Sequence, residues 1–211
     1  MILIKEKLVK NKMELPIELK SELESRININ ELKELSENTK NLSEKYRKDS
    51  GNSKRLLTTD KEASAYSLFR MPATYGAVSK ALEYTFNLKN ADEIHTLLDI
   101  GAGTGAGTGA ASWAASKLLN LNNIICLERE TAMLNLGKDL AKYSNEECLK
   151  KSEWLKRDLV EEKLKEEADL VIVSYVLNEM KKEERIKVLE KIWNATKDVL
   201  IIIEPGTPVR I

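Results

Sequence analysis

The part of this sequence that most constrains its fold is an apolar run that ends in an acid, continues into alternating glycines and leads into a helix-forming stretch. The run reads Leu97-Leu98-Asp99-Ile100-Gly101-Ala102-Gly103-Thr104-Gly105. Glycines let the backbone pass close to a ligand because no Cβ stands in the way, and the N-terminus of the next helix presents unpaired N–H groups. This pattern predicts a strand, a turn and a helix that together hold a nucleoside-containing cofactor.

Two other nucleotide-binding motifs compete for this segment. A phosphate-binding P-loop is excluded because no Gly-Lys-Ser/Thr follows. The dinucleotide fingerprint is formally satisfied by Gly101, Gly103 and Ala106. Asp99 favours S-adenosylmethionine instead, because an acid two residues before the first glycine can accept a hydrogen bond from the cofactor's amino acid or from a loop amide. A glycine-rich turn without a ligand is the third alternative.

After residue 90, short apolar runs alternate with helical patterns, which is typical of βα units on a parallel sheet. We therefore expect a Rossmann-like α/β fold of the class I methyltransferase type. Its sheet should have the order 3-2-1-4-5, and because the chain ends soon after the fifth strand, the C-terminal strands of a complete sheet are expected to be missing. Strands are expected at 96–100, 123–127, near 148–157, at 169–175 and at 199–204, with helices at 106–119, 131–142 and 182–195.

Residues 1–90 are expected to form an N-terminal helical subdomain. Leu15, Leu19 and Leu23 recur at helical spacing, and further amphipathic helices are expected before residue 59. Next come a helix over 59–69 and a separate one that Pro72 opens and that runs to residue 88, because proline suits a first helical turn. Residues 91–211 are then the S-adenosylmethionine-binding methyltransferase domain, expected to be truncated at its C-terminus.

Two acids at strand ends are candidate cofactor ligands. Glu128 directly follows the second strand, where such folds place an acid that accepts both ribose hydroxyls, and its strand position and the motif favour this role over that of a solvated residue of the charged run 128–130. Asp158 could accept the adenine amino group, although a surface acid fits there almost as well. The candidate cofactor-binding residues are Asp99, Gly101, Ala102, Gly103, Gly105, Glu128, Arg129, Asp158 and Tyr175.

The loop after the fourth strand, Ser-Tyr-Val-Leu-Asn-Glu at 174–179, is the expected substrate-side wall, with Asn178 as a candidate contact. It has neither the Asn/Asp-Pro-Pro-aromatic motif that grips an amino nitrogen nor the Pro-Cys nucleophile of cytosine C5 chemistry. The catalytic residues are therefore unknown. Methyl transfer to a good nucleophile can proceed mainly by alignment, so an enzyme remains the favoured interpretation.

Composition excludes several classes of protein. No stretch approaches the ~18 consecutive apolar residues of a membrane span, so no membrane partner is expected. The two cysteines share no metal-type spacing, which predicts no metal site in this chain and favours a cytoplasmic localisation. Because 34 basic and 34 acidic residues balance to a net charge of +0, any nucleic-acid contact needs a local patch. The basic run at 40–55 is one candidate, although a solvated helix face explains it as well.

Four segments together resemble the small-ribosomal-subunit methyltransferase-like family (Rsm-twenty-two type). They are Phe69-Arg70-Met71-Pro72-Ala73-Thr74-Tyr75, the glycine loop with Ala111-Ser112-Trp113-Ala114-Ala115, Leu127-Glu128-Arg129-Glu130-Thr131-Ala132-Met133-Leu134, and Ile203-Glu204-Pro205-Gly206-Thr207-Pro208.

The resemblance implies S-adenosylmethionine binding, contact with ribosomal RNA or the small ribosomal subunit, and a role in ribosome assembly or rRNA methylation. It also implies that Arg70 and Tyr75 close over the pocket, and it adds Glu204 and Pro205 to the substrate side. Members of this family continue into a cysteine-bearing segment that binds an iron–sulfur cluster. Such a cluster is expected here only if a longer natural chain supplies cysteines after Ile211.

Two functions remain as alternatives to an rRNA-directed methyltransferase. One is a catalytically inactive ribosome-assembly or RNA-binding factor that retains the cofactor pocket, which the unmarked loop at 174–179 motivates. The other is a small-molecule methyltransferase whose N-terminal helices form a lid. The sequence gives no indication of the oligomeric state.

Overall fold

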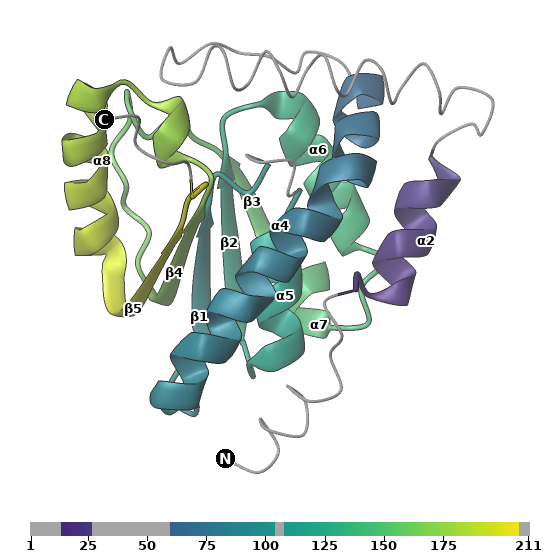
Figure 1. Cartoon of the computed structure of the whole chain (residues 1–211), viewed down its shortest axis with the longest axis horizontal. Helices are drawn as coiled ribbons and strands as arrows, with labels where there is room; N and C mark the ends of the chain where they lie inside the picture. The colour runs from purple at the N-terminus through teal and green to yellow at the C-terminus, as the bar shows by residue number, and fades with distance from the viewer. Residues whose placement is uncertain (1–13, 27–59, 104–107, 207–211) are drawn as a thin grey trace.

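A five-stranded parallel sheet forms the centre of the computed structural model, which describes residues 14–26, 60–103 and 108–206 (Figure 1). The strand order is β3-β2-β1-β4-β5, with every neighbouring pair parallel. This confirms the expected Rossmann-like topology and its order. The strands are β1 (Thr96–Ile100), β2 (Asn123–Glu128), β3 (Glu153–Lys156), β4 (Ala168–Ser174) and β5 (Thr196–Ile203).

Helices cover both faces of the sheet, which explains why its central strands are apolar on both sides. The face that includes Leu97 and Ile124 packs against most of the helices, and the face that includes Leu98 packs against α8. Successive side chains in a strand point to opposite faces, so β1 supplies both cores. The helices are α2 (Ile17–Ser25), α4 (Asp60–Leu88), α5 (Ala110–Leu118), α6 (Thr131–Ala141), α7 (Glu147–Lys150) and α8 (Lys182–Ala195), with the short 3-10 helix η3 (Leu177–Glu179) after β4.

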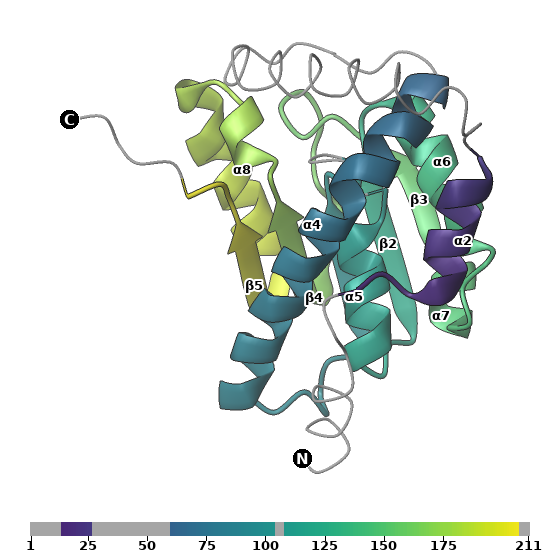
Figure 2. The same cartoon turned by 45° about the vertical axis from the view of Figure 1, so that its right-hand side comes forward.

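The longest helix, α4, crosses the molecule diagonally in front of the sheet and packs on α5 (Figures 1 and 2). The expectation of two helices separated at Pro72 is wrong, because α4 continues through this proline. Buried side chains on both sides of the proline, among them Tyr66, Met71 and Val78, anchor the helix to the core. This packing outweighs the cost of an interior proline.

Leu19 and Leu23 of α2, together with much of α4, belong to the same hydrophobic cluster as the sheet. The described N-terminal helices therefore share one core with the βα units. The other helices expected before residue 59, and the basic run at 40–55, lie outside the described residues. No described helix is long and apolar enough to span a membrane.

The observed elements differ from the expected ones mainly at their ends. The first crossover helix, α5, begins at Ala110, four residues later than expected, and Gly109 precedes it in the left-handed conformation with φ +79°. The weak third strand is only four residues long, and α7 occupies part of the range proposed for it. Short elements of this kind are fixed by packing on their neighbours rather than by periodicity.

Candidate cofactor pocket

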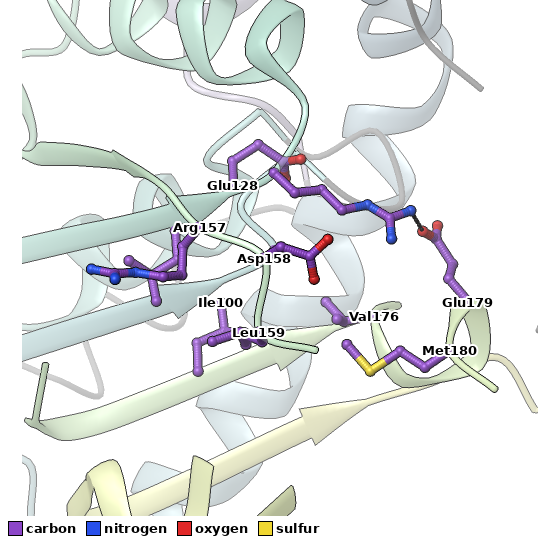
Figure 3. A pocket seen from close by; sticks show the side chains of 11 residues that line it. Ile100, Glu128, Arg157, Asp158, Leu159, Val176, Glu179 and Met180 are labelled. Atoms are coloured by element: carbon purple, nitrogen blue, oxygen red, sulfur yellow. Dashed lines mark ion pairs between the residues drawn. The ribbon is translucent and has the colours of Figure 1, made fainter. Parts of the chain in front are cut away.

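A pocket opens at the carboxyl ends of the strands (Figure 3). It contains four of the residues expected at the cofactor, which come from three different strand ends and are Gly101, Glu128, Arg129 and Asp158. Its apolar walls are formed by Ile100, Leu127, Leu159, Val176 and Met180. In open α/β sheets this edge is where ligands bind, because the loops that follow the strands converge there.

Glu128 is held in place by backbone N–H groups on both sides of its carboxylate. The N–H of Gly103 donates to Oε2 at 2.7 Å, and the N–H of Glu130 donates to Oε1 at 2.7 Å. Burial raises the pKa of Glu128 to about 7, against the lowering effect of these two bonds. A carboxylate has about four acceptor positions, so two remain for hydroxyl groups of a ligand.

The glycine turn before α5 is folded back on the end of β2. Gly101 has φ +68°, and its N–H and that of Ala102 both donate to the carbonyl of Leu127 at 2.9 Å. A Cβ on Gly103 would lie 2.5 Å from Cβ of Met133 and 2.8 Å from Oε2 of Glu128. Only glycine permits this close approach, so the turn and Glu128 form one structural unit. Gly105 lies outside the described residues.

Asp99 does not line the pocket. Its side chain is buried beneath the turn, and Oδ2 accepts hydrogen bonds from the N–H and Oγ of Ser112 at 3.1 and 2.8 Å. Burial raises its pKa to about 6. Strand alternation explains this position, because Asp99 shares a face with Leu97, the face on which α5 lies. Its observed contact is therefore with the start of α5.

Sequence reasoning missed Glu179, which lies on the opposite side of the pocket from β2. Oε2 of Glu179 forms an ion pair with Nη2 of Arg129 at 3.5 Å, and Nε of Arg129 is also 3.5 Å from Oε1 of Glu130. Burial raises the pKa of Glu179 to about 8; Arg129 lowers it, while Glu128 and Glu204 raise it further. The sequence signal was its place in the loop after the fourth strand, beside Asn178.

The end of β3 contributes two charged residues to the pocket. Asp158 lies beside it, and its Oδ1 accepts the N–H of Val160 at 3.0 Å. Arg157 also lines the pocket, but its guanidinium forms ion pairs with Glu166 at 2.7 Å and Glu162 at 3.4 Å. The positive charge of Arg157 is therefore already balanced outside the pocket.

The cofactor candidate Tyr175 and the substrate-side candidate Glu204 both fix the loop after β4 to the end of β5. Tyr175 has φ +60°, and its N–H donates to the carbonyl of Ile203 at 2.8 Å. Oε1 of Glu204 accepts the N–H of Leu177 at 2.8 Å, so this carboxylate fixes the loop after β4. Asn178 lies in η3 within this loop, and Pro205 is exposed. Neither Tyr175 nor Glu204 lines the pocket.

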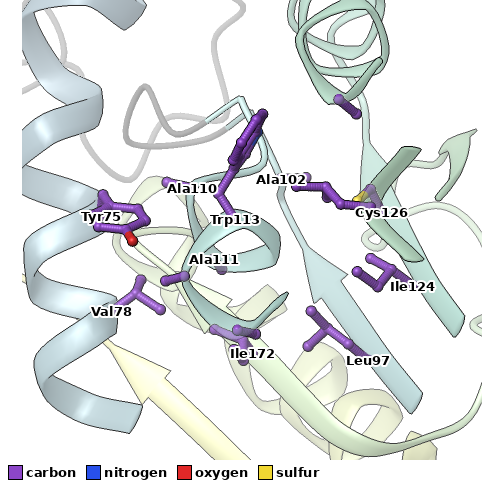
Figure 4. Close-up of a cluster of buried hydrophobic side chains, with 14 of the residues drawn as sticks. Tyr75, Val78, Leu97, Ala102, Ala110, Ala111, Trp113, Ile124, Cys126 and Ile172 are labelled. Carbon is purple, nitrogen blue, oxygen red and sulfur yellow. The ribbon is translucent and has the colours of Figure 1, made fainter. Parts of the chain in front are cut away.

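Neither of the two α4 residues that were expected to close over the pocket lines it. Tyr75 is 4% exposed and points toward Ala110 and Ala111 of α5, within the core (Figure 4). Arg70 is exposed and forms a hydrogen bond with Tyr66. The charge of Glu179 contributes to the raised pKa of Tyr66, about 12, so this part of α4 lies near the pocket entrance.

The described residues fit a nucleoside-containing cofactor. Glu128 offers acceptors for two ribose hydroxyls, and the apolar walls suit a flat base. Gly103 shows the close backbone approach that the turn requires. Within the described ranges no group of His, Cys, Asp and Glu side chains is arranged to hold a metal ion.

Several solved methyltransferase structures have a similar fold. The DhpI-SAM-HEP complex has a TM-score of 0.55 at 18% identity and covers 72% of this chain and 64% of that chain. The plantazolicin methyltransferase BpumL in complex with SAH has a TM-score of 0.54 at 15% identity, and the match covers 77% of this chain and 60% of that chain. A SAM-dependent methyltransferase from Leishmania major has a TM-score of 0.52 at 13% identity, covering 69% and 55%. At these identities the likeness establishes the fold.

A human protein is related in sequence. The ribosome assembly protein METTL17, mitochondrial, of Homo sapiens is 29% identical over 155 residues, which make up 72% of this chain and 33% of the human protein. The chain thus spans about a third of the length of this relative.

The family model described as Mitochondrial small ribosomal subunit Rsm22 matches residues 60–210. The expected cytoplasmic localisation is wrong, because both this family and the human relative are named as mitochondrial. The general signals used for that expectation, cysteine spacing and composition, carry no information on the organelle. The resemblance of the four sequence segments is confirmed, and the chain belongs to the mitochondrial small ribosomal subunit Rsm22 family.

Proposed function

We propose that this chain binds S-adenosylmethionine in the pocket at the carboxyl ends of the strands and acts as a methyltransferase on the RNA of the small ribosomal subunit. The observation that carries the proposal is Glu128, a buried carboxylate at the end of β2 that faces the glycine turn and lines the pocket. The family and the ribosome assembly protein METTL17 support the ribosomal part of the proposal.

Several residues in and behind the pocket have a defined task in this proposal. Glu128 accepts the two ribose hydroxyls, and Asp158 is placed to accept a base amino group. The turn at Gly101 and Gly103 lets the backbone lie against the cofactor, and Asp99 holds the start of α5 behind that turn. The bound cofactor supplies an activated methyl group; the protein aligns it and excludes water.

Replacement of Glu128 by alanine tests the cofactor site. We expect titration calorimetry to show binding of S-adenosylmethionine, with weaker or no binding of NAD. Glu128→Ala should weaken the binding of S-adenosylmethionine by about 1–3 kcal/mol, because a charge-assisted acceptor is lost. Glu153→Ala, at an exposed position on β3, is the matched control and should leave the affinity unchanged. Tighter binding of NAD than of S-adenosylmethionine would contradict the proposal.

A second candidate function is an assembly factor that binds the cofactor without performing chemistry. It is favoured by the contact between Glu204 and the N–H of Leu177, which commits an acid expected on the substrate side to holding the loop in place. The name of the human relative also describes an assembly protein.

Methyl incorporation separates the two candidates. Small subunits isolated from cells that lack the protein are incubated with it and with radiolabelled S-adenosylmethionine, and the rRNA is then counted. The methyltransferase proposal expects label in the rRNA that the Glu128→Ala variant fails to add. Restoration of subunit assembly by the wild-type protein, with no label in the rRNA, would establish the assembly factor instead.

A further inference from the structure

We propose that Glu179 makes this pocket selective for positively charged ligands, so that it holds S-adenosylmethionine, which carries a sulfonium charge, more tightly than the uncharged thioether product S-adenosylhomocysteine. This inference rests on the proposed function, since it concerns the same pocket. It adds a residue that discriminates substrate from product.

The charges around the pocket are unbalanced toward negative. The pocket is lined by three carboxyl groups, those of Glu128, Asp158 and Glu179. Two arginines, Arg129 and Arg157, also line it. The charge of Arg157 is already neutralised by Glu166 and Glu162 outside the pocket. Arg129 is thus the one pocket cation, among the described residues, that remains to balance these acids.

Of the three carboxyl groups that line the pocket, Glu179 depends most on a further cation to stabilise its ionised form. Within the described part of the chain, Glu179 forms an ion pair with Arg129 at 3.5 Å, and this pair is shared because Arg129 lies equally close to Glu130. Other charged or titratable groups lie around it. They are Glu128 and Glu130 at the end of β2, Glu204 at the end of β5 with Arg185 of α8 near it, Tyr66 with its partner Arg70 on α4, and Asp158, which lines the same pocket.

Burial also disfavours the ionised form of Glu179. The side chain of Glu179 is 17% exposed, and burial raises its pKa to about 8, so in the empty pocket it is largely protonated near neutral pH. A ligand cation favours the ionised carboxylate, so the proton leaves when such a ligand binds. A neutral ligand has no such effect on Glu179.

The same charge balance assists product release. In methyl transfer the S–CH3 bond would break with its electron pair staying on sulfur, the methyl group would form a new bond to the acceptor atom, and the acceptor would give up its proton to solvent. The ligand thereby loses its positive charge, and Glu179 again lacks a counter-charge. The pocket then takes up a proton and holds the product less tightly than the substrate.

Calorimetry on the full chain tests this inference. Glu179→Gln keeps the shape of the side chain and removes its charge. We expect the variant to bind S-adenosylmethionine about tenfold more weakly, the equivalent of one pKa unit, and S-adenosylhomocysteine with an affinity changed less than about twofold. Glu190→Gln, at an exposed position of α8, removes the same charge away from the pocket and should change neither affinity.

Proton release is the second measurement, and it needs no variant. The wild-type chain is titrated at about pH 7.5 in two buffers that differ in ionisation enthalpy, and the protons lost by each ligand's own amino group are subtracted. We expect S-adenosylmethionine to release at least about half a proton more than S-adenosylhomocysteine.

The outcomes are distinguishable. Equal weakening of both ligands by Glu179→Gln, or equal proton release by both ligands from the wild type, overturns the selectivity while leaving the cofactor site in place. Failure of either ligand to bind the wild type overturns the proposed function as well. If Glu179→Gln does not fold, the proton release of the wild type decides.

Discussion

Gly137 on α6 determines how closely this helix approaches β3. The indole ring of Trp154, on β3, lies directly against the glycine, and a Cβ added there would overlap the ring. The same ring lies 3.2 Å from the position of a Cβ on Gly109, at the end of the glycine turn. Trp154 therefore packs against both α6 and the glycine turn. It fits there because residue 137 is a glycine and has no side chain.

Gly137→Ala should lower the free energy of unfolding by about 1–3 kcal/mol, because the new methyl group displaces the indole ring and this exceeds the gain in helix propensity. Urea denaturation measures the change. Lys138→Ala, at the next position and exposed, is the control and should change stability by less than about 0.5 kcal/mol. A Gly137→Ala protein that is more stable than the wild type would show that Trp154 moves aside without cost.

At the scale of elements, α4 keeps a proline in its interior. Pro72 has no N–H to donate to the carbonyl of Leu68, four residues earlier, and its ring crowds that turn. The helix persists because its buried side chains, such as Met71 and Leu82, pack on α5 and the sheet. Tertiary contacts here outweigh local backbone preference.

Pro72→Ala should raise the free energy of unfolding by about 1–3 kcal/mol, since it restores the hydrogen bond to Leu68 and removes the crowding. Pro72 is exposed, so no packing is lost. Ala73→Gly, at the neighbouring exposed position, should instead lower stability by about 1 kcal/mol. Thermal unfolding followed by circular dichroism compares the two. A destabilised Pro72→Ala protein would mean that a bend at the proline is needed for packing.

At the scale of the whole molecule, burial of acids sets how stability depends on pH. Burial raises the pKa of Asp99 to about 6, of Glu128 to about 7 and of Glu179 to about 8. The empty folded protein therefore binds more protons than the unfolded chain between about pH 4 and pH 8. Acids whose pKa is lowered, such as Asp139 and Asp169, change the pH dependence of stability only below this range.

The unfolding free energy of the ligand-free protein should thus fall by at least about 1 kcal/mol between pH 5 and pH 8. Urea denaturation across this range measures it. Asp99→Asn should flatten the part of the curve between about pH 4 and pH 6.5, because the titrating group is removed. A stability that rises steadily from pH 5 to pH 8 would contradict this assignment of the buried acids.

The sequence by itself determined the βα units and the position of the candidate cofactor pocket. Strand β1 has the bounds expected from its apolar run, and Glu128 lies at the carboxyl end of β2 beside the glycine turn. These features depend on local patterns, since short apolar runs indicate buried strands and glycines indicate tight turns. The order of a parallel sheet then brings the strand ends together.

Only the tertiary structure decided which partner each side chain meets. Asp99 contacts Ser112 of α5 rather than the pocket, Tyr75 is buried in the core, and Glu179 faces Arg129 across the pocket. The partners are distant in sequence or lie on another element, so periodicity along the chain carries no information about them. Packing of α4 over α5 and convergence of the loops after β2 and β4 set these contacts, because burial leaves each side chain few alternatives.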